Sequence, residues 1–527
     1  MTAGSLREAL EKWRGSYVSV QPLSEEGAER QLQGAQLIGE MRESLLARLK
    51  YNGGPAPIRF LASYSDLQSL DRIDEADSVT PLDPISHASL CRTVFQASEV
   101  ALLNIAELAE RTKTDLEAGR IGEAEEKYRW ISALQRSLAS FSNLLVHFPP
   151  ASDGSLLTIR GSSAFSEADQ SLEIMRSAII DAELVSGRQI IEGQLYEPAR
   201  NLTHQVFSDL VFEDLSKEGL GNVIIPDVYP GEAKELPYDT FVGAHYIRLS
   251  VQEIDHVGDT FFRQFRAFHQ MSEIFAKQAN HLLAAVVDEL TREDGSLPRA
   301  SSLMRTALSF LEFLPENLDP LLKNLSVSRY QDFRVSLGIT SGSHSPNIRK
   351  NLFNTLYPLV VRSVEMRVKE AGDELSNSLN DAIAHVYDRR FEDPQANSLV
   401  SLCEGAVSLH FTLRHWRDLH LQFVKTHLGI SETAPTASVA GAKDGVSTAA
   451  RIREHAHAEK KDPIKELYEA MYRRPYSPSS PFMPYASETF AGQIAARTAK
   501  AVKITSAAIQ ERVALKAASK IQPPTVP

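Results

Sequence analysis

Three histidines, a tryptophan and an arginine stand among apolar residues in the stretch HWRDLHLQFVKTHLG, residues 415–429. At helical spacing, one face of this stretch collects imidazole, aromatic and aliphatic side chains, those of Trp416, His420, Phe423, Val424 and His427. His420, in the middle of that face, can be an ordinary histidine of the hydrophobic core. It can also be an axial ligand of heme iron, because a rigid helix fixes the direction of a neutral imidazole.

A second stretch, DTFFRQFRAFHQMSEIF at residues 259–275, places another imidazole beside an aromatic ring. Phe265 and His269 are four residues apart, so they are neighbours on one helical face. The ordinary interpretation is a core helix with a polar residue at its edge. The functional interpretation is a histidine that acts as hydrogen-bond partner or general base toward a flat ligand.

A third stretch, YQDFRVSLGITSGSHSPNIRKNLF at residues 330–353, combines a loop of small residues with the start of a helix near Asn347. Exposed backbone N–H groups at such a start favour an anion. Arg349 in the first turn can add a two-pronged contact to a carboxylate. The alternative is an ordinary capped helix start with a solvated arginine.

Composition restricts the classes of function. The formal charge is 56 − 68 = −12, which disfavours a general nucleic-acid or anionic-membrane role. Two cysteines, Cys91 and Cys403, are too few for a disulfide framework or a zinc–thiolate site, so a reducing, intracellular compartment is expected. There is no signal-type apolar run at the N-terminus and no uninterrupted apolar 18-mer, so we expect a cytoplasmic protein that does not enter membranes.

Helical periodicity dominates the chain, and strand-like alternation is nearly absent. The pattern predicts helices over residues 89–119, 124–148, 172–215, 244–254, 257–291, 299–326, 347–390 and 397–428. Gly119 is expected to end the first of them as a C-cap. The predicted fold class is therefore all-α, with a bundle-like architecture.

Composition shifts divide the chain into four predicted parts. These are a helical half at 1–216, a Gly- and Pro-rich linker at 217–235, a second helical domain at 236–445, and a Pro-containing tail at 446–527. The tail ends in an Ala- and Lys-rich helix, predicted at 488–520.

Two segments of the N-terminal half are similar in sequence to two segments of the C-terminal half. FQASEVALLNIAELA from Phe95 parallels HQMSEIFAKQANHLLA from His269, and a second parallel sets Ser163 opposite Ser341. The offsets between paired positions differ by only four residues, which favours a duplicated helical unit. Because the functional-looking residues are not repeated, the N-terminal half is predicted to be a degenerate, non-catalytic copy.

Taken in order, HQMSEIF, DFRVSLGITSGSHSPNIR and WRDLHLQFVKTHLG resemble three motifs of the tryptophan 2,3-dioxygenase superfamily of heme-dependent aromatic oxygenases. The resemblance covers roughly residues 236–445. It implies a helical bundle of the tryptophan/indoleamine dioxygenase type, heme b as cofactor, O2 as co-substrate and assembly as a homo-oligomer.

The resemblance also implies a role for individual residues. His420 would be the proximal ligand of the heme iron, and His269 the distal histidine near dioxygen and the ring nitrogen of the substrate. Phe265 would line the aromatic pocket, and Arg349 would pair with the substrate carboxylate. Further substrate contacts would come from the Ser-Gly pair of the second motif, here Ser341 and Gly342.

The sequence departs from the family pattern in two loops. The family's Phe-Gln-Ser is Ser-His-Ser here, so Ser343 replaces a pocket aromatic. The family's glycine-rich loop after the last helix is replaced by SETAPTASVAGAKDG at 431–445. Both loops are expected to face the substrate, so its identity and the fate of the second oxygen atom stay open.

Three functions follow from these residues. The first is a heme-dependent dioxygenase that inserts O2 across the indole C2–C3 bond of L-tryptophan or a related indole amino acid. The second is a heme-dependent monooxygenase or hydroxylase of an aromatic amino acid derivative on the same scaffold. The third, from another class, is a non-catalytic helical scaffold or a heme sensor, in which His420 is a core residue or binds heme without turnover.

Overall fold

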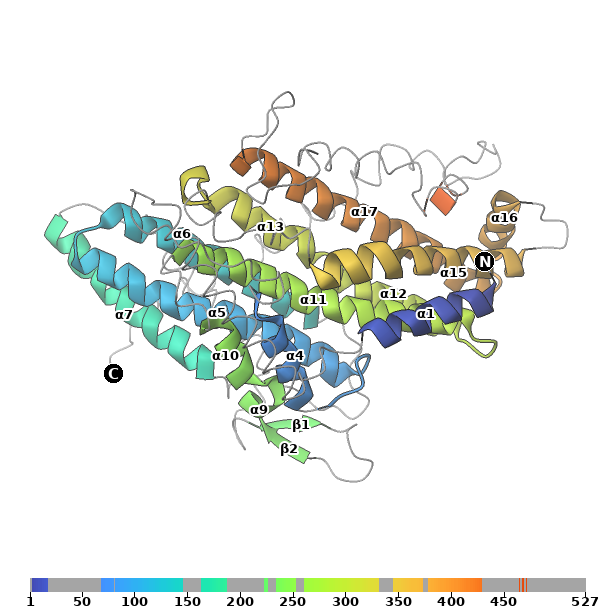
Figure 1. Ribbon diagram of the computed structural model, residues 1–527, viewed down its shortest axis with the longest axis horizontal. Coiled ribbons are helices and arrows are strands. Elements are labelled where there is room, and N and C mark those ends of the chain that lie inside the picture. Colours follow the sequence, from blue (N-terminus) through green and yellow to red (C-terminus); the bar gives the residue numbers. More distant parts are fainter. Residues whose placement is uncertain are drawn as a thin grey trace, which may run out of the picture.

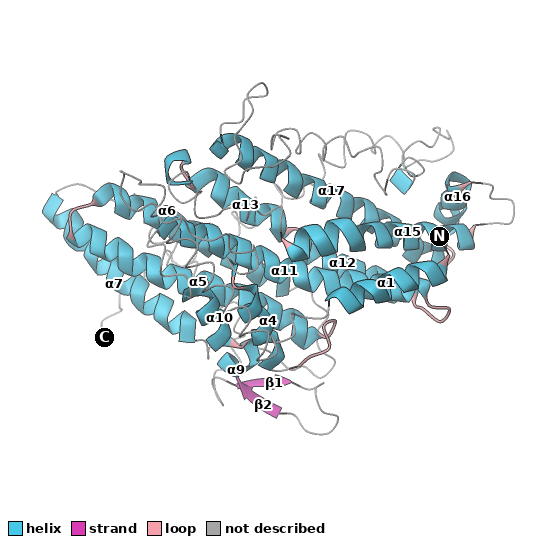
Figure 2. Ribbon diagram, viewed as in Figure 1, coloured by secondary structure: helices cyan, strands magenta, loops and turns pink. Residues whose placement is uncertain are grey.

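The computed structural model describes residues 2–17, 68–79, 81–145, 163–186, 222–225, 234–252, 260–330, 345–372 and 378–428, together with 464, 467–468 and 471. Within these ranges the protein is mainly α-helical, as predicted (Figure 2). The exception is a two-stranded antiparallel hairpin, in which Asn222 of β1 pairs with Pro237 of β2. None of the described helices is both long and apolar enough to cross a membrane.

The N-terminal helices are α1 (Ala3–Tyr17), α4 (Leu70–Val79), α5 (His87–Glu117), α6 (Ile121–Leu145) and α7 (Ser163–Ser186). The middle of the chain holds β1 (Asn222–Ile225), β2 (Lys234–Pro237), α9 (Tyr238–Val242) and α10 (Ala244–Gln252). The C-terminal elements are α11 (Thr260–Thr291), α12 (Leu297–Leu311), α13 (Phe313–Asn324), the π-helix η4 (Pro346–Leu356), α15 (Tyr357–Ala371), α16 (Leu379–Arg389) and α17 (Pro394–Leu428).

Helix α5 illustrates how local sequence sets the ends of an element. The Ser86 hydroxyl accepts a hydrogen bond from the Ser89 N–H at 3.2 Å, which caps the first turn. At the other end Gly119 adopts a φ of +72°, and its N–H donates to the Leu116 carbonyl at 3.0 Å. The predicted glycine C-cap is therefore confirmed, since the left-handed conformation costs glycine little.

Helix α11 runs through the middle of the molecule and packs against α1, α5, α12, α13, α15 and η4 (Figure 1). It lies antiparallel to α5, because Thr93 contacts Gln278 near one end of the pair and Glu107 contacts Arg263 near the other. The buried apolar side chains of all these helices form one continuous core. The predicted N-terminal and C-terminal halves thus share a core, while the three boundaries between the four predicted parts stay predictions.

Two predicted helices are wrong in extent. The segment 299–326 divides into α12 and α13, and Pro315 lies in the first turn of α13, where a missing N–H is tolerated. The segment 347–390 divides into η4, α15 and α16. Pro358 lies in the first turn of α15, and Gly372 follows its last residue. Helical periodicity alone does not register these interruptions, because apolar spacing continues across them.

Helices α1 and α4 were not predicted, although both bury apolar side chains. Helix α7 begins nine residues before the predicted segment 172–215, of which the part after residue 186 lies outside the described residues. The tail helix predicted at 488–520 also lies outside them.

Candidate functional site

His269 lies on α11 and is 8% exposed. Its Nδ1 is 2.7 Å from the Phe265 carbonyl oxygen, and since a carbonyl only accepts, Nδ1 carries the proton. Burial lowers the pKa of His269 to about 4, against a smaller opposing effect of that hydrogen bond. At neutral pH the ring is therefore uncharged, and Nε2 is the nitrogen with a lone pair.

His420 lies on α17 and is partly exposed. Its ring stacks on Trp416 with 5.2 Å between centroids and 4° between planes, which fixes its orientation. Burial lowers the pKa of His420 to about 4, and an electrostatic interaction with His269 lowers it further. The fold thus brings the two candidate imidazoles, 151 positions apart in the chain, close enough for protonation of one to disfavour protonation of the other.

His427 has a different environment. It is 1% exposed, its Nδ1 is 2.9 Å from the Phe423 carbonyl oxygen, and its Nε2 is 2.8 Å from that of Leu325. Leu325 is the C-cap residue of α13. Because both ring nitrogens lie against carbonyl oxygens, His427 ties α17 to the end of α13, and both of its nitrogens are already engaged within the fold.

The remaining histidines near it on α17 are also distinguishable from His420. His415 is exposed, and the Nδ1 of His410 lies 2.8 Å from the Tyr357 hydroxyl. No hydrogen bond to the ring of His420 occurs within the described ranges. Among the described residues, His420 is therefore a neutral, oriented imidazole with no hydrogen bond at either ring nitrogen.

Aromatic rings join α11 to α17 beside the two histidines. Phe265 lies 6.1 Å from Phe423 between ring centroids, and Tyr330 packs against both, at 6.2 and 5.3 Å. All three rings are buried. Phe265 was predicted to line an aromatic pocket, whereas Tyr330 was missed. In the sequence, Tyr330 is marked only by its position as the first residue of the stretch 330–353, which also contains Arg349.

The predicted helix start near Asn347 is confirmed. The Ser345 hydroxyl accepts a hydrogen bond from the Ile348 N–H at 2.8 Å, and Pro346 occupies the first turn. The element is a π-helix, a rare form that occurs frequently at functional sites and that the sequence did not predict.

Arg349 lies half-buried in the first turn of η4. One turn later Phe353 packs on Trp416 at 5.6 Å between centroids, and Trp416 in turn stacks on His420. Arg349 thus lies on the same element as Phe353, and that element contacts the Trp416 ring on which His420 stacks. Phe353 is a second residue that the sequence interpretation missed.

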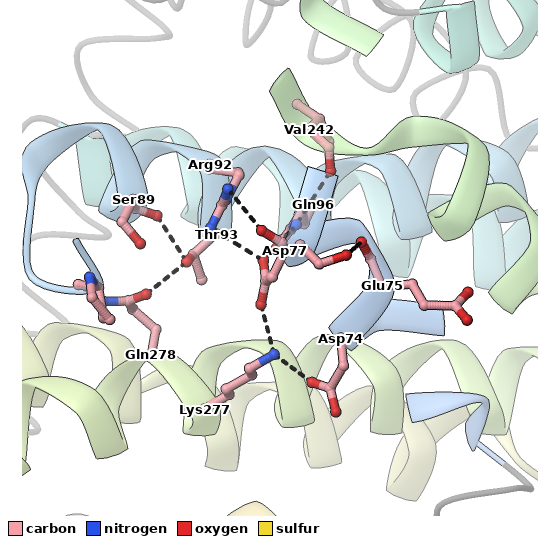
Figure 3. Close-up of polar contacts among 12 residues, drawn as sticks. Asp74, Glu75, Asp77, Ser89, Arg92, Thr93, Gln96, Val242, Lys277 and Gln278 are labelled. Atoms are coloured by element: carbon pink, nitrogen blue, oxygen red, sulfur yellow. Dashed lines mark hydrogen bonds and ion pairs between the residues drawn. The ribbon is translucent and has the colours of Figure 1, made fainter. Parts of the chain in front are cut away.

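A charged cluster fixes α11 relative to α4 and α5 (Figure 3). Lys277 of α11 contacts Asp74 and lies 2.6 Å from Asp77, which also accepts a hydrogen bond from the Gln96 amide at 3.0 Å. Arg92 lies 3.5 Å from the same carboxylate. Burial by itself would raise the pKa of Asp77, but Lys277 and Arg92 outweigh it and hold that pKa below its ordinary value.

Two predicted substrate contacts, Ser341 and Gly342, lie outside the described residues, as do Ser343 and the loop 431–445. Among the residues that are described, no group of three or more His, Cys, Asp or Glu side chains could hold a bare metal ion. The donor chemistry at His420 fits a heme, which needs a single neutral imidazole from the protein at an axial position.

No protein-family model matches the chain, and no curated protein matches it. The likeness to the dioxygenase superfamily therefore rests on the motif residues.

Proposed function

We propose that this protein is a heme-dependent oxygenase that acts on L-tryptophan or a related indole amino acid. One observation carries the proposal: His420, neutral and without a hydrogen bond to its ring from the described residues, lies within electrostatic reach of the neutral, buried His269. A heme held at His420 would supply the iron that binds and activates dioxygen.

The chain's own residues would orient the His420 ring and bind the substrate. Stacking on Trp416 holds the plane of the His420 ring in one orientation. The buried rings of Phe265, Tyr330 and Phe423 form an apolar wall that would shield a substrate bound against it from water, which would strengthen polar interactions with that substrate.

His269 is suited to receive the indole N–H of the substrate. Its Nδ1 proton is committed to the Phe265 carbonyl, so Nε2 accepts a hydrogen bond and orients the indole ring. Arg349 would bind the substrate carboxylate through two parallel N–H contacts. Insertion of both oxygen atoms across the C2–C3 bond gives an N-formylkynurenine-type product and consumes one O2 per substrate.

The test is an absorption spectrum of the full-length protein expressed with added heme. The wild type should show a Soret band, and His420→Ala should lose it. His427→Ala changes another histidine of α17, one that is buried with both nitrogens against carbonyl oxygens, and should keep the band and lose only stability. Oxygen uptake with L-tryptophan should then match substrate loss one to one.

A wild-type protein without a Soret band would overturn the heme proposal and favour a non-catalytic helical scaffold. A Soret band that survives in His420→Ala would place the ligand at another residue.

A further inference from the structure

The first turn of η4 is fastened to α11 by two partly buried amide contacts. The Asn347 amide donates to the Glu273 carboxylate at 3.0 Å, and the Asn280 amide donates to the Asn347 carbonyl at 3.0 Å. Glu273 and Asn280 both lie on α11 and are 1% and 0% exposed. The burial of these two side chains limits competition from water at the α11 end of each contact, and a hydrogen bond to a carboxylate is among the stronger kinds. We call this set the α11–η4 clamp.

The clamp connects the two elements that carry the proposed site. Glu273 follows His269 by four residues, one turn of α11, and Asn347 precedes Arg349 by two residues in the first turn of η4. Glu273 and Asn347 therefore link the helix that carries His269 to the element that carries Arg349.

A π-helix needs such support more than an α-helix does, because long runs of its hydrogen-bond pattern are rarely stable by themselves. The cap at Ser345 fixes where η4 begins along the chain, but only contacts to another element fix where that start lies in space. A displacement of about 1 Å of a substrate-binding group can cost about a hundredfold in rate.

We infer that Glu273 and Asn347 are positioning residues that set the Arg349 guanidinium relative to His269, so that the site selects aromatic ligands bearing a carboxylate. The inference rests on the proposed function, in which His269 meets the indole ring and Arg349 the carboxylate. The clamp acts on the carboxylate end of the ligand alone, because Phe265 and His269 are held by α11 itself.

The experiment compares two ligands on the full-length, heme-supplied protein by calorimetric titration. L-Tryptophan carries the carboxylate, and tryptamine has the same indole and amine without it. Asn347→Ala should raise the Kd for L-tryptophan about tenfold or more and change that for tryptamine less than about twofold.

The chain offers a matched control in Asn317. It is a buried asparagine of α13 whose amide donates to the hydroxyl of Ser272 on α11 at 3.3 Å. Asn317→Ala removes an amide contact to the residue next to Glu273 without touching η4, and should leave both dissociation constants unchanged.

A double-mutant cycle tests whether Asn347 acts through Arg349. In an Arg349→Ala background, Asn347→Ala should weaken L-tryptophan binding no further, whereas independent effects would add. Glu273→Gln keeps an acceptor oxygen for Asn347 and should bind L-tryptophan more tightly than Glu273→Ala. If Asn347→Ala melts too low for titration, Asn347→Gln keeps the amide one methylene farther out and should show the same selective loss.

Equal weakening of both ligands in Asn347→Ala, or additive losses in the cycle, would overturn the inference while leaving the proposed function intact. A wild-type protein that binds neither ligand would overturn the proposed function and the inference with it.

Discussion

Two imidazoles on different helices, His269 and His420, share a property that separates them from a surface histidine. Burial lowers the pKa of each to about 4, and each ring is therefore neutral across the physiological range. A neutral imidazole is the form that ligates a metal or accepts a proton. The same burial couples both residues to the stability of the fold.

The sign of that coupling follows from the protons bound in each state. The unfolded chain takes up protons on these histidines near their ordinary pKa of 6.5, while the folded chain resists until pH is about 4. The free energy of unfolding is therefore highest above pH 6.5 and falls as pH drops from 6.5 toward 4. For His269 the loss is on the order of 3 kcal/mol.

Urea unfolding of the apoprotein at several pH values between about 7 and about 4.5 measures this loss. His269→Gln, which cannot be protonated, should give a flatter dependence than the wild type. Parallel curves for the two proteins would show that His269 does not resist protonation in the folded state.

At the scale of elements, the junction of α9 and α10 depends on one glycine. Gly243 has a φ of +69°, and a Cβ there would meet the Cα and the carbonyl oxygen of Ala76 in α4, each at 2.7 Å. Gly243→Ala should therefore lower the free energy of unfolding by about 3 kcal/mol or more, from backbone strain and overpacking together.

Gly119 is the matched control, because its φ is +72° and a Cβ added there would have no heavy atom within 4 Å. Gly119→Ala should cost about 1 to 2 kcal/mol, the backbone term alone. Thermal and urea unfolding of both variants measures the difference. Equal losses would mean that α4 moves aside without cost.

The charged cluster of Figure 3 holds α4 against α5 and α11. Asp77→Asn removes the carboxylate that faces both Lys277 and Arg92, and leaves Lys277 to its contact with Asp74. We expect a loss of about 2 kcal/mol in the free energy of unfolding, since breaking one partner of a partly buried pair exceeds the worth of a surface pair.

The control for this change is Glu11→Gln, which breaks an exposed ion pair with Arg14 at 2.7 Å. It should change the free energy of unfolding by less than about 0.5 kcal/mol. Similar small effects for Asp77→Asn would show that the cluster does not anchor α4.

At the scale of the whole molecule, the N-terminal helices are part of the core that carries the site. Helix α5 covers one side of α11, and the Trp130 ring of α6 packs 5.9 Å from that of Phe268, the residue before His269. The N-terminal half, predicted to be a degenerate, non-catalytic copy, thus contributes to the core around α11. The internal repeat itself stays a prediction.

Deletion of residues 1–215 should therefore abolish soluble, heme-loaded protein, because the apolar side of α11 that faces α5 would be exposed to water. Expression, size-exclusion chromatography and the Soret absorbance measure the outcome. A truncated protein that stays monodisperse with unchanged heme content would contradict a shared core.

Sequence patterns predicted most of the helical content. Helix α5 with its cap at Gly119, helix α17, the start of η4 and the candidates His269 and His420 all follow from local spacing. This works because helical periodicity and capping depend on residues within a few positions of each other.

The tertiary structure decided which hydrogen bonds the rings of these histidines make. His427 and His420 occupy the same helical face in the sequence, yet a carbonyl 102 residues away at Leu325 engages one of them and no described residue hydrogen-bonds the ring of the other. The sequence patterns also did not predict that η4 is a π-helix, or that Asn347 contacts Glu273, a residue 74 positions away. Hydrogen-bond partners of this kind are fixed by the packing of whole helices, which periodicity within one helix does not encode.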